Sequence, residues 1–151
     1  MGTGWRRCSV REAAGRRRIV GLAEIDREHQ LQIALVDAFE KAAGANEPAE
    51  GGRILEQMAD LSEMHFLAEE LVMQLHQYAA YQEHANEHAQ LLEEMDRLLK
   101  QNAAGTLGLT LELANRLRRT LAHHLAGADY ALSAYLREEG IVETDPGTAP
   151  S

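Results

Sequence analysis

The residues best suited to chemistry in this chain are histidines and carboxylates that recur at helical spacing among leucines. His65 and Glu69 are four residues apart, as are His84 and His88, so on a helix each pair shares one face. Two such side chains can bind one metal ion. The full set of candidate metal ligands is His29, His65, Glu69, His84, His88, His124 and Asp129.

The last pair of candidates has a different spacing. His124 and Asp129 are five residues apart, which on an α-helix corresponds to a rotation of about 140°. We therefore expect these two side chains not to share a face. His124 would bind one ion from the side, whereas Asp129 would reach across the core and bridge two ions.

The chemistry of the donors narrows the choice of metal. Imidazole nitrogens and carboxylate oxygens without thiolate suit non-haem iron, although manganese and zinc also accept them. If both carboxylates bridge two six-coordinate ions and an oxo or hydroxo group is shared, one coordination position stays open. That position could take a small molecule.

Four amphipathic segments would position these residues. Apolar side chains three or four apart predict helices over about 21–43 and 54–78, a third from 81 through 98, and a fourth from 113 to near 140. No Gly or Pro marks the turn before the third. Helices of about 20 residues joined by short loops predict an all-α fold, an up-down-up-down antiparallel four-helix bundle with the ligands inside.

Composition and charge exclude several classes of protein. A chain of 151 residues, 45% hydrophobic, is long enough for one core. Its net charge of -9 disfavours nucleic-acid binding, which needs a cationic surface. No segment has the apolar run of about 20 residues that a membrane span needs, and the first residues contain no apolar secretory signal. The single cysteine, Cys8, cannot close an intramolecular disulfide, so we expect a cytoplasmic protein.

The amino-terminal segment differs from the rest in charge. Residues 1–18 contain six arginines and one acid, a net charge of +5 that leaves -14 for the remainder. We expect a flexible basic arm over 1–18, a bundle over 19–138 and a flexible tail over 139–151. A role for the arm in binding a protein partner or a membrane surface stays open.

The motifs resemble those of a known family. The stretch HFLAEELVMQLHQYAAYQEHANEHAQLLEEM, residues 65–95, resembles the central signature of the hemerythrins. IVGLAEIDREHQ, residues 19–30, is similar to their first-helix motif, and HHLAGAD, residues 123–129, to their last-helix pattern. The resemblance covers roughly residues 19–138.

This resemblance implies a function and a role for each ligand. His84, His88 and His124 would bind one iron, and His29 and His65 the other. Glu69 and Asp129 would bridge the two irons together with an oxo or hydroxo group. The iron with two histidines would bind O2 reversibly, for oxygen carriage, storage or sensing rather than for catalysis.

The resemblance also implies an O2 pocket lined by Phe66, Thr120, Leu121 and Leu125. Water that reaches bound O2 would leave an oxidised site, so an apolar lining favours reversible binding. Bacterial members often have Trp four residues before the last-helix histidine, where this chain has Thr120. We therefore predict a wetter pocket and faster autoxidation.

Alternative interpretations remain. The residues from His84 to His88 spell HxxEH, the inverted zinc-protease motif, in which Glu87 would be the general base. A ferritin-like oxidase would need two Glu-x-x-His pairs, and the sequence contains none. A di-iron site could also serve a redox, nitric oxide or iron-buffering role. Glu70 and His123 are expected to contact solvent, and His76 has no assigned role.

Overall fold

The computed structural model describes residues 22–142, so the predicted arm at 1–18 and the predicted tail from residue 143 onward lie outside the described residues. Within residues 22–142 the chain forms helices joined by turns and no strand, and the all-α prediction is confirmed for this part. The elements are α2 (Leu22–Gly44), α3 (Pro48–Leu75), α4 (Tyr81–Ala103), α5 (Leu111–His124), the π-helix η2 (Leu125–Asp129) and α6 (Tyr130–Glu138).

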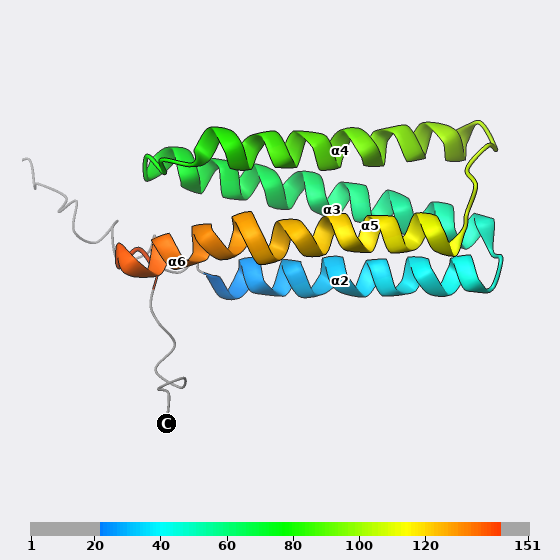
Figure 1. The fold of residues 1–151 in the computed structure, drawn as a ribbon, viewed down its shortest axis with the longest axis horizontal. Helices are drawn as coiled ribbons and strands as arrows, with labels where there is room; N and C mark the ends of the chain where they lie inside the picture. Colours follow the sequence, from blue (N-terminus) through cyan, green and yellow to red (C-terminus); the bar gives the residue numbers. More distant parts are fainter. Residues whose placement is uncertain (1–21, 143–151) are drawn as a thin grey trace, which may run out of the picture.

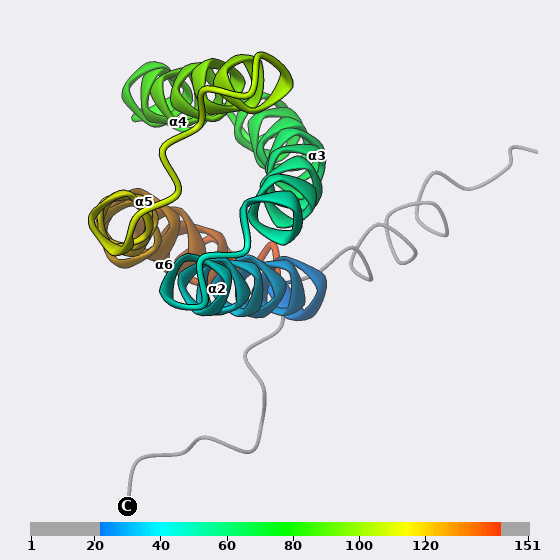
Figure 2. The ribbon, with the colours of Figure 1, turned by 90° about the vertical axis from the view of Figure 1, so that its right-hand side faces the viewer.

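These elements form a helical bundle of four rods. Three of the rods are α2, α3 and α4, and the fourth consists of α5, η2 and α6, which follow one another without a break. The rods lie lengthwise beside one another, and consecutive rods run in opposite directions (Figure 1). Viewed end on, they surround a common interior (Figure 2). Among the described helices, none is both long and apolar enough to span a membrane.

The start of α3 differs from the sequence-based expectation. The helix begins at Pro48, in the first turn, where a missing backbone N–H is tolerated, and not near Ile54. Gly51 and Gly52 are buried inside it. A Cβ atom on Gly52 would lie 2.4 Å from the side chain of Asn102, at the end of α4. The two glycines therefore permit close packing and do not form a turn.

Two apolar clusters occupy the ends of the bundle. The larger one joins α2, α3, α4 and α5 through residues such as Phe39, Leu55, Met58, Leu98 and Leu117. The smaller one consists of Met73, Leu132, Leu136 and Val142. Val142 belongs to the predicted tail, so the packed part of the chain extends beyond residue 138. Along α3, both predicted ligands lie between Met58 and Met73, which places a polar layer between the two apolar clusters.

Candidate metal centre

All seven predicted ligands meet in this polar layer, and every rod contributes. Six of them are buried, with exposed fractions of 2% or less: His65, Glu69, His84, His88, His124 and Asp129. The seventh, His29 on α2, retains 15% exposure of its side chain. The structure therefore brings together the full set that the spacing of the sequence selected.

The carboxylate of Glu69 lies between two groups of histidines. Its Oε1 atom is 3.6 Å from Nε2 of His29 and 3.4 Å from Nε2 of His65. Its Oε2 atom is 3.1 Å from Nε2 of His88 and 3.6 Å from Nε2 of His84. One oxygen therefore faces the histidines of α2 and α3, and the other faces those of α4.

Asp129 repeats this arrangement from the opposite side of the interior. Its Oδ2 atom is 3.1 Å from Nε2 of His29, and its Oδ1 atom is 3.0 Å from Nε2 of both His84 and His124. The donor atoms thus form two groups that share both carboxylates. In each group the atoms lie within 4.8 Å of one another: His29 and His65 with Glu69 and Asp129, and His84, His88 and His124 with the same two carboxylates.

The π-helix η2 explains how Asp129 reaches this position and corrects the sequence-based geometry. We expected His124 and Asp129 to point in different directions because an α-helix rotates by about 140° over five residues. A π turn closes after five residues, so both side chains lie on one face. The distance of 3.0 Å between His124 Nε2 and Asp129 Oδ1 follows directly.

Unpaired polar atoms test whether the layer fits metal ions. The buried atoms without a hydrogen-bond partner include Nε2 of His29, His65, His88 and His124, Oε2 of Glu69 and Oδ2 of Asp129. Buried polar atoms of this kind are costly unless something satisfies them. Donor atoms about 2.1 Å from one ion and at right angles are about 3 Å apart. The nitrogen–oxygen separations in the layer fit that spacing.

The pKa values of the candidate ligands also support a metal site. Burial lowers the pKa of His29, but the carboxylates of Asp129 and Glu69 close to its Nε2 atom outweigh this effect and raise the pKa to about 9. The pKa of His84 is also raised to about 9, for the same reason. Burial opposes ionisation of both carboxyls, yet these imidazoles hold their pKa values well below the usual range. Two anionic groups are therefore kept inside the bundle, where cations must balance them.

Three glutamates that the sequence-based analysis did not select hold the outer nitrogens of the histidines. Each contacts Nδ1 of a histidine on the next rod: Glu28 that of His65 at 2.6 Å, Glu70 that of His88 at 3.0 Å, and Glu87 that of His124 at 2.7 Å. A carboxylate oxygen only accepts, so Nδ1 carries the hydrogen and Nε2 is left for a metal. Glu70 is therefore engaged with His88 instead of being merely solvated.

The position of Glu87 bears on the zinc-protease alternative. That mechanism needs Glu87 as a free general base beside a zinc ion held by His84 and His88. Here its carboxylate is bound to the outer nitrogen of His124, away from the inward-facing Nε2 atoms. The same contact gives Glu87 a role in orienting a ligand of the larger histidine group.

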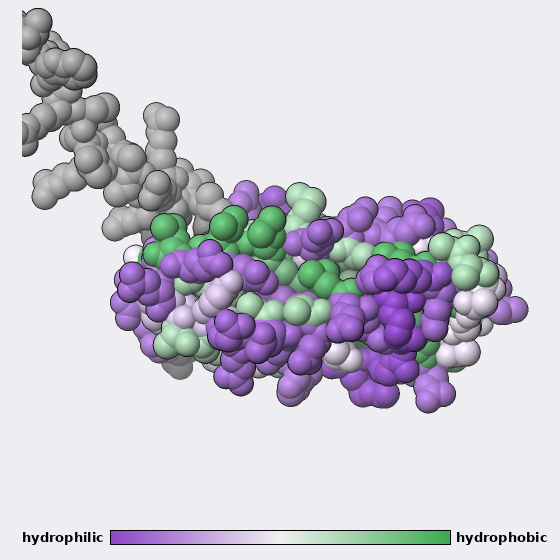
Figure 3. Space-filling model, turned by 90° about the horizontal axis from the view of Figure 1, so that it is seen from above, coloured by the Kyte–Doolittle hydropathy of each residue, from purple (hydrophilic) through white to green (hydrophobic). Residues whose placement is uncertain are grey.

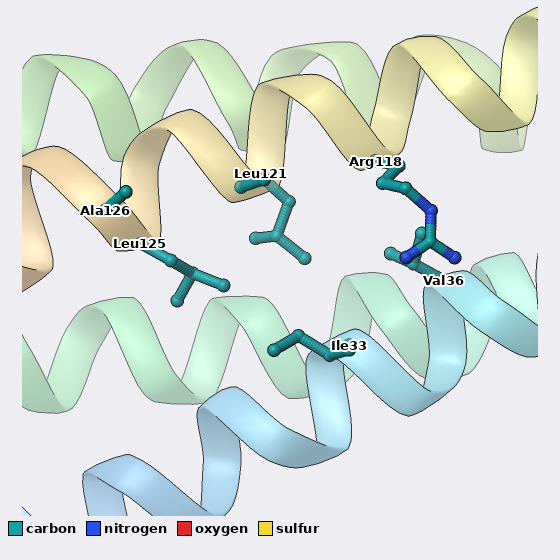
Figure 4. Close-up of a pocket in the computed structure, with 7 residues that line it drawn as sticks. Ile33, Val36, Arg118, Leu121, Leu125 and Ala126 are labelled. Atoms are coloured by element: carbon teal, nitrogen blue, oxygen red, sulfur yellow. The ribbon is translucent and has the colours of Figure 1, made fainter.

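The four residues predicted to line an O2 pocket lie in different surroundings. Phe66 is buried in the layer, with its ring stacked on His88 at 4.1 Å between centroids. Leu121 and Leu125 line an apolar pocket of about 470 Å³ between α2 and the α5–η2 rod. Figure 4 shows both leucines directed toward Ile33, with Arg118 at the other end of the pocket.

Thr120 lies on the surface and not in the interior. Its hydroxyl donates a hydrogen bond of 3.0 Å to the carbonyl of Arg116. It lines a second pocket, of about 210 Å³, together with Glu87, Gln90, Leu91, His123 and His124. A pocket therefore lies between Thr120 and His124, and His123 is exposed there, as predicted.

A buried polar pair next to the smaller histidine group was also missed. Gln32 and Ser62 are fully buried, and the amide of Gln32 donates to Ser62 Oγ at 3.3 Å. The amide oxygen of Gln32 has no partner. Gln32 lies one turn after His29, and Ser62 one turn before His65, so this pair borders the site on the side of the larger apolar cluster. His76, which had no assigned role, lies at the end of α3, where its carbonyl accepts from Tyr135.

Comparison with known proteins agrees with the geometry. The sequence model of the hemerythrin HHE cation binding domain matches residues 20–136, which includes all seven predicted ligands. No curated protein and no solved structure matches the chain at a significant level.

Proposed function

The chain belongs to the hemerythrin family, and from this premise we propose that its polar layer holds two non-haem iron ions, joined by an oxo or hydroxo group, and binds O2 reversibly. The observation that carries the proposal is the position of the two carboxylates. Glu69 and Asp129 each present one oxygen to His29 and the other to histidines on the opposite side. Two bridging carboxylates between unequal histidine groups favour a pair of ions over a single one.

The residues have distinct tasks in this proposal. His84, His88 and His124 hold one ion through Nε2, and His29 and His65 hold the other. Their Nδ1 contacts with Glu28, Glu70 and Glu87 fix three of these rings. The ion held by His29 and His65 would have fewer protein ligands, and it would supply the chemistry of O2 binding.

The surroundings support binding of a small apolar molecule. Phe66 packs on the ring of His88, and Leu121 and Leu125, which come before and after His124 in the chain, line an apolar pocket. An apolar shell excludes water from the ions and slows irreversible oxidation. We infer a binding role, in oxygen carriage, storage or sensing, and not an enzymatic one.

A second function is favoured by a specific observation. A pocket next to Thr120 is lined by Glu87 and His124, and the Gln32–Ser62 pair adds polarity next to the other histidine group. Both features make the surroundings of the ligands more polar. They favour a redox or nitric oxide-responsive role, in which oxidation by O2 is one-way, over long-lived oxygen carriage.

The experiment that separates these functions is an oxygen cycle. The full chain is reconstituted with ferrous iron without air, its iron content is measured, and the visible spectrum is followed while O2 is admitted and removed. About two irons per chain and a spectrum that returns on deoxygenation support reversible binding. Two irons with a one-way change support the redox role.

A matched pair of variants links the signal to the layer. Glu69→Gln should remove the signal because a neutral amide is a poor bridging ligand, whereas Glu63→Gln, on the exposed surface of the same helix, should leave it unchanged. A single zinc per chain with peptidase activity would overturn both functions.

A further inference from the structure

An apolar row without a partner among the described residues runs along the outside of α3. Met64, Leu67, Leu71 and Leu75 are exposed by 73%, 58%, 57% and 62%. They are three or four residues apart, so they lie on one side of the helix, away from the buried ligands. Figure 3 shows apolar side chains gathered toward one end of the face seen from above. We call these four residues the α3 row; a patch of this kind marks an interaction site.

The border of the α3 row is acidic. Asp60 precedes Met64 by four residues and Glu63 precedes Leu67 by four, so each is a surface neighbour of the row. Glu56 extends the same edge, and all three acids are exposed. From Ile54 to Leu75, α3 contains no lysine or arginine. A partner for this surface therefore needs apolar side chains accompanied by positive charge.

The register between α2 and α3 shows which residues of α2 lie at the level of the α3 row. Glu28 contacts His65, and Gln32 contacts Ser62. Because the two helices run in opposite directions (Figure 1), moving from Glu28 back to Leu22 corresponds to moving from His65 forward to Leu71. The first described residue, Leu22, to which the preceding segment is attached, therefore lies at the level of Leu71 along the bundle.

We propose that the α3 row binds the basic segment 1–18 of the same chain. This segment carries six arginines among apolar residues that include Trp5 and Val10. From Met64 to Leu75 a helix rises about 16 Å, and an extended chain covers about 3.4 Å per residue, so a short part of the segment spans the row. Apolar side chains cover the leucines, and guanidinium groups pair with Asp60 and Glu63.

The charge of α3 argues against a second copy as the occupant. Two α3 rows in contact would bring the acidic borders of both copies together, and juxtaposed like charges oppose association. The basic segment supplies the opposite charge and is already tethered near the site, which raises its effective concentration.

The sequence provides specific probes for a test, since Cys8 is the only cysteine and Trp5 the only tryptophan. A benzophenone maleimide is attached to Cys8 of the iron-loaded full chain, and the crosslinked peptides are identified by mass spectrometry after irradiation. An equal mixture of natural-abundance and ¹⁵N-labelled chains distinguishes links within a chain from links between chains.

The proposal expects links from Cys8 to the peptide that contains the α3 row, within single chains. A Leu67→Glu, Leu71→Glu double variant should lose these links and shift Trp5 emission to the red, whereas Leu111→Glu, at an equally exposed leucine of α5, should change neither. Circular dichroism checks that each variant is folded.

Three outcomes would overturn the proposal. Links between light and heavy chains would identify a second copy as the occupant. Links to another surface, or none, would leave the row to a different partner. Links that survive the double variant would show that the leucines do not form the site. None of these results depends on the oxygen cycle, so this proposal and the proposed function fail separately.

Discussion

The middle of the bundle and its ends are built on opposite principles. At the ends, side chains such as Phe39, Leu55 and Leu136 are almost fully buried among apolar neighbours. In the middle, six polar side chains are buried as deeply as that, a seventh is mostly buried, and several of their atoms lack a hydrogen-bond partner. The ends stabilise the fold by removing apolar area from water, whereas the middle opposes folding until cations satisfy it.

The parts that stabilise the fold and the part that binds metal are therefore at different positions along the length of the bundle. A substitution in an apolar cluster should change the free energy of unfolding and leave the ligand set intact. A substitution in the polar layer should change metal binding with a smaller effect on the metal-free fold. Each prediction below tests that division, beginning with the largest expected effect.

The largest effects are expected from one alanine substitution in the polar layer and one in an apolar cluster. His84→Ala should reduce the iron content below two per chain and abolish the visible signal, because His84 faces both carboxylates. Leu98→Ala should lower the free energy of unfolding by about 2–5 kcal/mol, as expected for a buried leucine, while the chain still binds two irons. Iron analysis and urea unfolding measure both. Full iron content in His84→Ala would contradict the ligand assignment.

The dependence of stability on pH should differ between the metal-free and the iron-bound protein. In the metal-free protein the pKa values of His29 and His84 are raised from 6.5 to about 9, so their stabilisation is complete below pH 6.5 and is lost as pH rises through 9. The depressed pKa values of Glu69 and Asp129 act on the acid side, where stabilisation is lost as pH falls. With iron bound, the ions replace the protons, and alkaline destabilisation should disappear.

Urea unfolding at pH 6 and pH 9 measures this contrast. Each pKa unit corresponds to about 1.4 kcal/mol, so the metal-free protein should lose a few kcal/mol between the two values. The histidine and carboxyl shifts describe the same ion pairs and are not added together. An unchanged unfolding midpoint in the metal-free protein would mean that the layer is not balanced by protons.

A smaller effect is expected at the outer glutamates. Glu87→Gln should weaken binding of one iron by about tenfold, since charged partners of metal-bound histidines typically contribute 10–100-fold. Glu93→Gln, exposed on the same helix, is the matched control. Competition with a chelator measures the affinity, and equal affinities in the two variants would show that the contact with His124 does not support the metal.

Substitution of the Gln32–Ser62 pair tests whether polar residues at the border of the layer affect stability and oxidation of the iron. A Gln32→Leu, Ser62→Ala double variant removes a buried amide oxygen without a partner and should raise the free energy of unfolding by about 1–3 kcal/mol. It should also slow oxidation of the iron by keeping water away. Gln30→Leu, exposed on the same helix, should do neither. A loss of stability would mean that an ordered water already satisfies this oxygen.

The smallest effect is expected at Thr120. Thr120→Trp should fill much of the 210 Å³ pocket beside His124 and slow the decay of the oxygenated form a few-fold, with no change in unfolding. Thr106→Trp, exposed in the turn after α4, controls for the added indole. Decay at the original rate would show that water reaches the ions by another path.

Sequence periodicity was sufficient for the all-helical fold and for placing the paired ligands of α3 and of α4 on one face of each helix. His65 shares a face with Glu69, and His84 shares one with His88. Both relations depend only on spacing within one helix, which can be read directly from the sequence. Periodicity misplaced the start of α3, because Gly51 and Gly52 allow close packing inside the helix and do not form a turn. For Gly52 this role depends on where Asn102 lies.

The outer glutamates and the polar pair were missed for a related reason. Glu28, Glu70 and Glu87 each lie next to a candidate ligand in the chain but contact a histidine on the following rod. Such contacts depend on the register between helices, which a single sequence does not contain. A carboxylate adjacent to a ligand on three successive helices was the available signal.

The wide turn at Leu125–Asp129 has a consequence for the packing of the last rod. An additional residue in an α-helix rotates everything after it by about 100°, which would carry Leu132 and Leu136 out of the interior. Here the π turn contains one residue more than an α turn, and both leucines stay buried. The wide turn therefore absorbs one residue of chain length without turning the apolar face of α6 out of the interior.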